Sequence, residues 1–556
     1  MCSITRMLTL LFVIAAGVVC TFAGDRYHPE QYTEPRTEPA GRLLRSSETT
    51  TQFWVEDAQA ALRQRHTDGL RHRSGHARNV VMFLGDGMSV PTLTAARVLL
   101  GQRQGQTGEE ANLAFDKFPT TGLVKTYCVN RQVADSACSA TAYLCGVKGN
   151  AGTIGVNGAV PRHDCTASTD AARRVQSIAE WALADGRDAG IVTTTRITHA
   201  SPAGVYGKTA NRNWETDADV VNAGHDTERC PDLAHQMIHK HPGNKFKVIF
   251  GGGRRAFLPN TTRDEEGTRG RRTDDRNLIE EWQADKAARN VSYKYIWNRE
   301  ELAELASSPP EFLLGLFEGT HMRYHMEADP STEPTLAELT EVAIRSLSRN
   351  ERGFFLFVEG GRIDHAHHDN FARLALDETI EMSKAVARAA ELLDEEDSLI
   401  VVTADHAHVM SFNGYSPRGQ DILGTNNDRD RNGVPYMTLS YTNGPGRRVQ
   451  DANMRVDVTQ EDNFGALRWR SHVDFPLSSE THGGDDVAVF ARGPHHAIFT
   501  GLYEQSHIPH RMAYAACIGP GLHACSAAHS LRGSLLAALM LLFLILWFSK
   551  PYDFVI

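Results

Sequence analysis

The chain has 556 residues, and 41% of them are hydrophobic, so it is long enough to bury a large core. Acidic residues (68) outnumber lysine and arginine (58), and the formal net charge is −10. Because the sequence contains no basic tract, nucleic acid is excluded as an expected binding partner.

The N-terminus has the pattern of a secretory signal peptide. Arg6 precedes an apolar run from Met7 to Cys20, and a small residue, Ala23, follows at the position of a cleavage site. We therefore expect residues 1–23 to be a signal peptide.

A polar leader follows, and it precedes a short helical pattern. Within residues 24–75 we predict a helix over Thr51 to Arg65, because Glu56 and Asp57 lie near its start and arginines lie near its end, which matches the helix dipole. We expect this helix to be an arm that packs on a partner subunit.

Short apolar runs then alternate with helical stretches. Such runs predict buried strands, and their alternation with helices predicts an α/β fold with a mainly parallel central sheet and helices on both faces. The predicted strands are Asn79 to Leu84, Ala189 to Thr193, Lys247 to Phe250, Phe354 to Val358, Leu399 to Thr403 and Ala488 to Ala491. The predicted helices are Thr92 to Leu100, Ala137 to Cys145, Ile178 to Ala184 and Ala372 to Leu393.

One polar segment interrupts this alternation. Residues 412–479 are rich in Gly, Asn and Asp and lie between two segments with candidate ligands, so we expect an inserted surface subdomain. The main α/β domain would then consist of residues 76–411 and residues 480–525.

The C-terminus resembles a glycosylphosphatidylinositol (GPI) attachment signal. Small residues begin at Ser526, a short polar stretch follows, and Leu535 to Phe548 is apolar. Residues 526–556 would then be a propeptide that is removed, with Ser526 as the attachment residue. The alternative is a C-terminal transmembrane anchor, for which 14 apolar residues are short.

Nine cysteines fit an oxidising compartment. Cys517 and Cys525 lie close together and predict a small-loop disulfide, and Cys165 and Cys230 flank a polar region and could pair. Three others remain in the mature chain, an odd number, so at least one is free or pairs elsewhere. These three are Cys128, Cys138 and Cys145.

Two tripeptides have the form of N-glycosylation acceptors, at Asn260 and Asn290. With the signals at both ends, they predict passage through the secretory pathway to the extracellular side of the plasma membrane.

The densest group of candidate ligands follows the strand Phe354 to Val358 and is interrupted by Gly360 and Gly361. Its members are Glu359, Asp364, His365, His367 and His368. Asp364 and His368 are four residues apart and share a face of a helical turn. Carboxylate and imidazole ligands suit zinc. The alternative is a solvated loop.

Acidic residues follow two other predicted strands in the same way. Asp86 follows the first strand, and Asp405 and His406 follow the strand Leu399 to Thr403. The carboxyl ends of parallel strands form the crevice in which ligands bind. The sequence therefore predicts a metal site at this edge of the sheet.

Ser136 stands at the start of an alanine-rich predicted helix. The N-terminus of a helix suits an anion such as phosphate, and a serine hydroxyl becomes a nucleophile when a base or a metal lowers its pKa. The alternative is that Ser136 is an ordinary N-cap.

Six segments, in this order along the chain, resemble signature segments of the animal alkaline phosphatases. They are VVMFLGDGM, DSACSATAYLCGVKGN, GIVTTTRITHASP, GFFLFVEGGRIDHAHH, VVTADHAH and ETHGGDDVAVF. The resemblance runs from about Phe53 to Cys525. It implies the alkaline-phosphatase fold with a crown-like inserted subdomain, a homodimer, and a GPI anchor.

The resemblance also implies a role for each matching residue. Ser136 matches the nucleophile that becomes phosphoserine, and Arg212 matches the arginine that grips the phosphate. The implied ligands are Asp364, His368 and His482 for one zinc ion, Asp86, Asp405 and His406 for a second, and Asp86, Ser201 and Glu359 for magnesium. The implied neighbours are His199 in the outer shell of magnesium, His365 near the phosphate and His408 behind a zinc ligand. His367 keeps a purely structural interpretation.

A calcium ion is a further candidate cofactor. The aligned positions are Glu266, the Phe317 carbonyl, Glu318 and Glu333, and oxygen ligands fit calcium. The sequence departs from the family after Glu318 and has Glu333 where an aspartate is usual, so solvated surface acids are the alternative. A further departure is the pair Cys128 and Cys138, which suggests an extra local disulfide beside Ser136.

The expected function is hydrolysis of phosphate monoesters through a phosphoserine, at two zinc ions and one magnesium ion, with an alkaline pH optimum. The rivals are a phosphodiesterase or sulfatase on the same scaffold and a non-catalytic surface receptor. The segment DSACSAT lacks a sulfatase nucleophile pattern, and Ser201 and Glu359 favour a third metal ion, which phosphodiesterases commonly lack.

Overall fold

The structure is a computed structural model that describes residues 75–305, 308–448 and 455–522. The predicted signal peptide, the helix over Thr51 to Arg65, Cys525 and the predicted GPI segment lie outside the described residues. Within the described ranges, none of the helices has the length and apolar character needed to cross a membrane.

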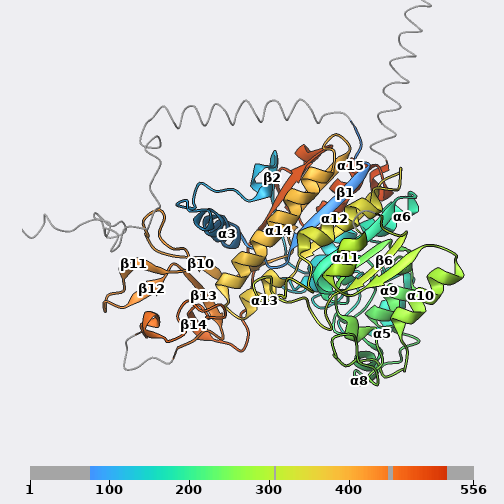
Figure 1. Ribbon diagram of the computed structural model, residues 1–556, viewed down its shortest axis with the longest axis horizontal. Coiled ribbons are helices and arrows are strands. Elements are labelled where there is room, and N and C mark those ends of the chain that lie inside the picture. Colours follow the sequence, from blue (N-terminus) through green and yellow to red (C-terminus); the bar gives the residue numbers. More distant parts are fainter. Residues whose placement is uncertain (1–74, 306–307, 449–454, 523–556) are drawn as a thin grey trace, which may run out of the picture.

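Ten strands form one central sheet, in the order β17-β2-β16-β8-β1-β7-β3-β4-β6-β5 (Figure 1). Their bounds are β1 Asn79–Gly85, β2 Thr120–Lys125, β3 Asp188–Arg196, β4 Val248–Gly252, β5 Tyr293–Ile296, β6 Phe312–Leu316, β7 Phe354–Gly360, β8 Ser398–Ala404, β16 Val487–Arg492 and β17 Gly501–Glu504. Neighbouring strands are parallel except where β16 pairs with β2 and β8. The predicted mainly parallel sheet is therefore confirmed.

Helices cover both faces of this sheet, as predicted. The helices α12 and α14 contact each other and pack on β7, whereas α6 packs on β7 and β3 and contacts α15 (Figure 1). The main helices are α3 Val90–Arg103, α4 Ser136–Cys145, α6 Ile178–Ala184, α10 Leu278–Ala288, α12 Leu336–Leu347, α14 Ala372–Leu392 and α15 His507–Ala516. The shorter ones are α5 Cys165–Thr169, α7 Ala200–Ala203, α8 Asp217–Asn222, α9 Leu233–His239, α11 Arg299–Leu305 and α13 Arg362–His368.

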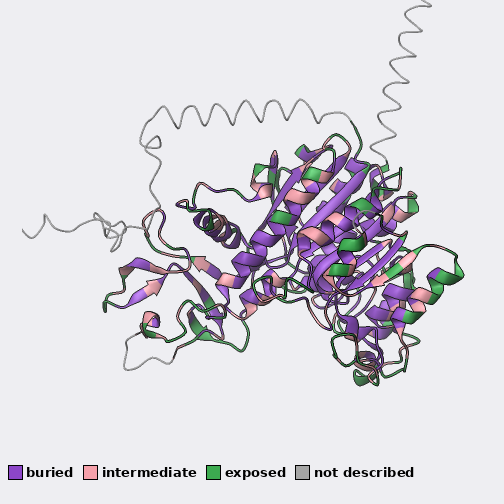
Figure 2. Ribbon diagram, viewed as in Figure 1, coloured by how far each residue is buried: buried purple, intermediate pink, exposed green. Residues whose placement is uncertain are grey.

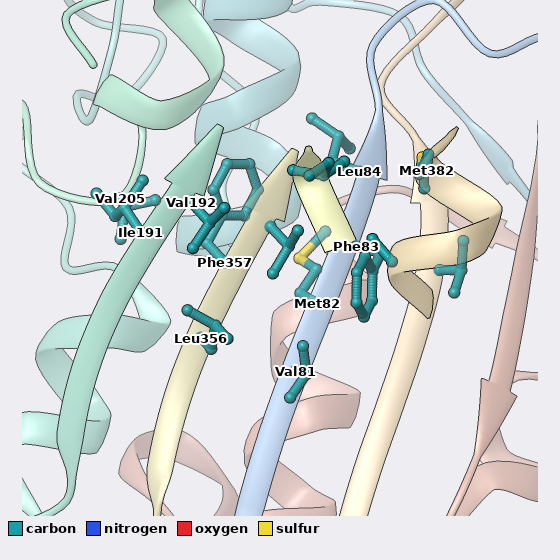
Figure 3. Packing of buried hydrophobic residues seen from close by; sticks show 14 of the residues in the cluster. Val81, Met82, Phe83, Leu84, Ile191, Val192, Val205, Leu356, Phe357 and Met382 are labelled. Atoms are coloured by element: carbon teal, nitrogen blue, oxygen red, sulfur yellow. The ribbon is translucent and has the colours of Figure 1, made fainter. Parts of the chain in front are cut away.

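The middle of the sheet is the core of the molecule. Every residue of β1, β7 and β8 is buried, and purple, the colour of burial, fills this region of Figure 2. Met82 of β1 is in register with Phe357 of β7, and both side chains belong to the buried cluster that Figure 3 shows. Apolar runs without alternation are buried on both faces, which explains why they predicted these strands correctly.

Residues 407–483 leave the central sheet and return to it. They hold small separate sheets, built from β9 Ala407–His408, β10 Met410–Phe412, β11 Thr425–Arg429, β12 Pro435–Met437, β13 Leu439–Gly444, β14 Val473–Pro476 and β15 His482–Gly483. The two ends of this excursion meet, because β15 pairs with β9 and places His482 opposite His408.

Two buried disulfides lie within the described residues. The predicted Cys165–Cys230 disulfide is confirmed, and the suggested Cys128–Cys138 disulfide is present as well. Cys145 is free and buried. Cys517 takes part in a disulfide, but its predicted partner, Cys525, lies outside the described residues. Of the two glycosylation acceptors, Asn290 is exposed and Asn260 is half-buried.

Candidate metal and nucleophile site

The candidate site lies at the carboxyl ends of three neighbouring strands. Gly85 of β1 is in register with Gly360 of β7 and with Ala404 of β8, so these strands end at one level. Asp86 follows β1 directly, Glu359 is the penultimate residue of β7, and Asp405 follows β8. The register alone thus brings three buried carboxylates to one edge of the sheet.

The first cluster contains the residues predicted to hold one zinc ion. Asp364, His368 and His482 gather with His408, and one ligand atom from each lies within 4.8 Å of the others. The Nε2 atoms of His368 and His482 are 3.1 Å apart. His408 Nε2 is 2.7 Å from Asp364 Oδ1, so His408 contacts a predicted zinc ligand.

A buried carboxylate that the sequence analysis did not single out supports this cluster. Glu480 hydrogen-bonds His408 Nδ1 and accepts from the Val409 N–H at 2.8 Å, and its backbone carbonyl accepts from His368 Nδ1 at 2.6 Å. Burial alone would lower the pKa of His408, but Glu480 and Asp364 raise it to about 10. The sequence offered one indication of this role, which is that Glu480 lies two residues before the predicted ligand His482.

The second cluster contains the residues predicted to hold the other zinc ion. Asp86, His406 and Asp364 offer atoms within 4.8 Å of one another, and Asp405 Oδ2 lies 3.1 Å from His406 Nε2. The N–H groups of Gly87 and His406, each at 2.9 Å, fix the other oxygen of Asp405. Burial, reinforced by the neighbouring carboxylates, raises the pKa of Asp86 well above its ordinary value.

The third cluster contains the predicted magnesium ligands. Asp86, Glu359 and His199 gather within 4.8 Å, and Ser201 Oγ donates to Asp86 Oδ2 at 3.2 Å. Thr193 and Thr195, which the sequence analysis did not assign, donate to Glu359 Oε2. The Oε1 atom of the same carboxylate is buried, with no hydrogen-bond partner among the described residues.

These three clusters fit divalent cations. Buried carboxylates need a compensating charge. Burial is the main reason why the pKa values of Asp86, Glu359 and Asp405 are raised here. The unpartnered Glu359 Oε1 and the close His368 and His482 nitrogens have the character of ligand atoms. Mixed oxygen and imidazole donors suit zinc, and oxygen-dominated donors suit magnesium.

Ser136 is the first residue of α4, and its hydroxyl faces the second cluster. Its Oγ lies 3.3 Å from His406 Nε2 and 3.5 Å from Asp86 Oδ1. The N-cap of α4 is Asp135, whose carboxylate accepts from the Cys138 N–H at 3.3 Å. The interpretation of Ser136 as an ordinary N-cap is therefore wrong, and the hydroxyl stands at the positive end of a helix.

A group of arginine and histidine side chains lies near Ser136. Arg212 donates to Asp135 Oδ2 at 3.0 Å and to His199 Nε2 at 3.2 Å. The ring of His365 lies 5.3 Å from that of His199. The ring of His321 lies 4.2 Å from that of His365. The sequence analysis did not single out His321, because its segment carries no recognised motif.

The candidate calcium residues lie apart from these clusters. Glu266 pairs with Arg254, Glu318 pairs with Arg323 at 2.9 Å, and Glu333 accepts from the Arg323 N–H at 2.6 Å. Among the described residues, their oxygens do not gather as closely as those of the three clusters. Burial, together with the charges of Glu318 and Glu266, raises the pKa of Glu333 to about 8, against the opposing effect of its backbone hydrogen bond.

Comparison with known proteins gives one family. Residues 77–518 match the family model described as alkaline phosphatase. The chain is 69% identical to a membrane-bound alkaline phosphatase of Bombyx mori, over 93% of this chain and 94% of that protein. It is 46% identical to the tissue-nonspecific alkaline phosphatase of Gallus gallus, over 90% and 97% of the two chains. The crystal structure of Thermus thermophilus alkaline phosphatase shares its fold, with a TM-score of 0.56 and 22% identity over 82% of this chain and 97% of that chain.

Proposed function

The chain belongs to the alkaline phosphatase family, whose members are phosphomonoester hydrolases, and we propose that it works through a phosphoserine formed at Ser136. The observation that carries this proposal is the place of the Ser136 hydroxyl, which stands at the N-terminus of α4 and 3.3 Å from His406 Nε2. A serine nucleophile needs an activating group beside its hydroxyl, and the N-terminus of a helix suits an anion.

The proposed reaction has two displacements at phosphorus. Arg212 holds two oxygens of the phosphate, and Ser136 Oγ forms a bond to phosphorus as the ester oxygen leaves. Water then forms the second bond to phosphorus, Ser136 Oγ leaves, and phosphate is released. Asp135 keeps Arg212 beside Ser136 through its 3.0 Å hydrogen bond, so the binding group and the nucleophile start in place.

We propose that two zinc ions and one magnesium ion are the cofactors. Asp364, His368 and His482 would hold one zinc ion. Asp86, Asp405 and His406 would hold the second zinc ion, and Asp86, Ser201 and Glu359 would hold magnesium. When bound, such ions lower the pKa of a hydroxyl or a water and stabilise the leaving oxygen. Three divalent cations exceed the charge of the four carboxylates in these sets, and the excess suits a phosphate dianion.

Several finer features belong to the same proposal. Calcium would bind Glu333, Glu318, Glu266 and the Phe317 carbonyl. Burial and the charge of Glu318 raise the pKa values of Glu333 and Glu266, and a bound cation would offset this cost. The name of the Bombyx mori relative, which is membrane-bound, supports attachment to a membrane, for which we propose a GPI anchor at Ser526. A homodimer, in which residues 412–479 form a crown-like subdomain, follows from the family resemblance.

The experiment compares the secreted full chain with Ser136→Ala. Wild-type enzyme should hydrolyse a phosphate monoester faster than a diester, with an alkaline optimum, and should incorporate ³²P from a labelled monoester at Ser136. Ser136→Ala should lose at least about a thousandfold in kcat and all of the label. Ser346→Ala, which changes a buried serine in α12, is the matched control. Label found on another residue, or kcat retained in Ser136→Ala, would refute the covalent step.

A further inference from the structure

A disulfide encloses the loop that leads into the nucleophile helix. Cys128 and Cys138 are bonded, with their Cα atoms 5.9 Å apart, and Cys138 lies in the first turn of α4, two residues after Ser136. The enclosed loop, residues 129–135, therefore has both of its ends fixed at one point. We call it the nucleophile loop.

The nucleophile loop is connected to three groups of the proposed mechanism. The Ala134 carbonyl accepts from His482 Nδ1 at 2.8 Å, which orients a proposed zinc ligand. Asp135 caps α4 and holds Arg212. Ser136 itself follows without a break. A shift of this loop would therefore move the nucleophile, the phosphate-binding arginine and a zinc ligand together.

A second set of contacts closes a ring through Gly152. Its N–H donates to Asp135 Oδ1 at 2.9 Å, and its carbonyl accepts from the Arg212 N–H at 2.9 Å. The Ala151 N–H donates to Asn130 Oδ1 at 2.9 Å on the other side of the loop. Arg212 is thus linked to the nucleophile loop twice, directly through the Asp135 side chain and indirectly through the backbone of Gly152.

Packing against the main core does not hold this loop. Cys128, Ala134 and Cys138 form a small buried cluster of their own, with Ala151 packed beside it. The outer side of the loop is open, since Val129 is 56% and Val133 is 39% exposed. Because the two sulfur atoms supply much of this separate cluster, the disulfide is its principal anchor.

The bond also removes a competing set of metal ligands. The Cys128 and Cys138 sulfurs and an Asp135 oxygen lie within 4.8 Å of one another. As free thiolates they would suit zinc, and zinc held there would take Asp135 away from Arg212. As a disulfide the two sulfurs are not thiolate ligands, and Asp135 stays with Arg212.

We propose that the Cys128–Cys138 disulfide is a positioning element of the active site, which fixes the nucleophile loop so that Arg212 and Ser136 are aligned for the phosphate. The proposal rests on the roles given above to Ser136 and Arg212. It assigns to this disulfide a function that the second one, Cys165–Cys230, does not share: that bond lies in a different buried cluster, which includes Ala210 and Trp214 but no residue of the nucleophile loop.

The test compares two double variants, Cys128→Ser/Cys138→Ser and Cys165→Ser/Cys230→Ser, with wild-type enzyme. The readouts are kcat and KM for a monoester, the inhibition constant of inorganic phosphate, the zinc content and the Tm. We expect the first variant to bind phosphate at least about tenfold more weakly at 25 °C, where circular dichroism shows it folded, and to lose kcat as well. The control variant should lose Tm while its phosphate inhibition constant stays within twofold of wild type.

A stabilising role alone would lower the Tm of the first variant and leave the phosphate inhibition constant unchanged, and that result would overturn the proposal. If this variant does not fold, the same constants are measured on wild-type enzyme reduced with a trialkylphosphine. The disulfide then takes two electrons and two protons to become two thiols, and the phosphine becomes its oxide with oxygen from water. Alkylation and mass spectrometry identify the opened bond, and an unchanged phosphate constant after Cys128–Cys138 has opened would again overturn the proposal.

Failure of the proposed function gives a different pattern. If wild-type enzyme shows no phosphoserine, or if Ser136→Ala keeps its activity, the covalent mechanism fails whatever the disulfide variants do. If the covalent mechanism holds and the two double variants bind phosphate equally well, only the positioning role fails.

Discussion

Arg212 is held by two hydrogen bonds, one to Asp135 and one to His199, so its guanidinium has a fixed orientation beside Ser136. A lysine is a single point charge and cannot replace a planar group that binds two oxygens. We predict that Arg212→Lys raises both KM and the phosphate inhibition constant by about tenfold or more, which corresponds to about 1.4 kcal/mol per tenfold.

Steady-state kinetics with phosphate as a competitive inhibitor checks this prediction. The control is Arg173→Lys, which changes an arginine on the surface that pairs with Asp170. Equal phosphate inhibition of Arg212→Lys and wild-type enzyme would show that the guanidinium does not grip the phosphate.

Glu378 of α14 is a buried carboxyl away from the three metal clusters, and its burial raises its pKa to about 7. In the unfolded chain a glutamate titrates near pH 4.3. Between these values the folded state binds a proton that the unfolded state does not, so this group favours folding at low pH. That contribution is lost as the pH rises through about 7, and the loss is on the order of 3 kcal/mol.

We therefore predict that Glu378→Gln raises the Tm at pH 8.5 and leaves it nearly unchanged at pH 5. A glutamine keeps an acceptor for the His325 N–H, which Glu378 binds at 2.7 Å. Glu381→Gln is the matched control, because that carboxylate lies on the same helix and pairs with Lys384. Scanning calorimetry at the two pH values tests this prediction. A Tm difference between variant and wild type that does not depend on pH would contradict the raised pKa of Glu378.

The candidate site could be predicted where several ligands stand close together in the sequence. Asp364 and His368 are one helical turn apart in α13, and Asp405 and His406 are adjacent after β8. Glu480 and His321 were missed because their partners lie far away in the sequence: His408 is 72 residues from Glu480. A single polar residue signals a site only when the fold supplies its neighbours.

At the scale of elements, the turn after β1 leaves no room for a side chain at Gly87. Gly87 has φ +70°, and a Cβ atom there would lie 2.4 Å from His408 Cδ2 and 3.2 Å from the Asp364 backbone. Its N–H also holds Asp405. An alanine at this position would meet both the cost of a left-handed conformation, about 1–2 kcal/mol, and a clash inside the first cluster.

We predict that Gly87→Ala lowers the zinc content and reduces kcat/KM by more than tenfold. Gly105→Ala provides a close control, because Gly105 has φ +77° and its Cβ would meet nothing within 4 Å. It should lose a comparable amount of stability and keep full activity and zinc. Metal analysis and kinetics separate the two variants, and equal behaviour of both would mean that backbone strain alone explains the effect.

The strands that the sequence predicted best lie in the middle of the sheet. The strands β1, β7 and β8 are apolar runs buried on both faces, and their predicted and observed bounds differ by one or two residues. Four strands of this sheet were missed. The strand β2 alternates between buried and exposed positions, β5 and β17 are short and partly exposed, and β6 is buried throughout but has only 5 residues. The strand order and the antiparallel direction of β16 depend on pairing between distant segments, which no local pattern encodes.

At the scale of the whole molecule, the proposed ligands join segments that are distant in the chain. Asp86 follows β1, Ser201 lies in α7, Asp364 lies in α13, and His482 returns from the excursion of residues 407–483. Cations bound by these side chains would therefore cross-link the central sheet, the helices on it and the small sheets. Without them, buried carboxylates at the sheet edge would repel one another.

We predict that chelation lowers the Tm by about 10 °C or more, because each ion at a thousand times its dissociation constant adds about 4 kcal/mol of stability. Ser136→Ala separates this effect from catalysis. That variant should be inactive yet keep its metal ions and a Tm close to wild type, and chelation should lower its Tm by the same amount. Scanning calorimetry with parallel metal analysis makes the comparison.

A protein shown to be free of metal that still melts at the wild-type temperature would mean that the clusters do not bind structural ions. Recovery of Tm with zinc and magnesium, but not with calcium alone, would assign the stabilisation to the three clusters at the sheet edge.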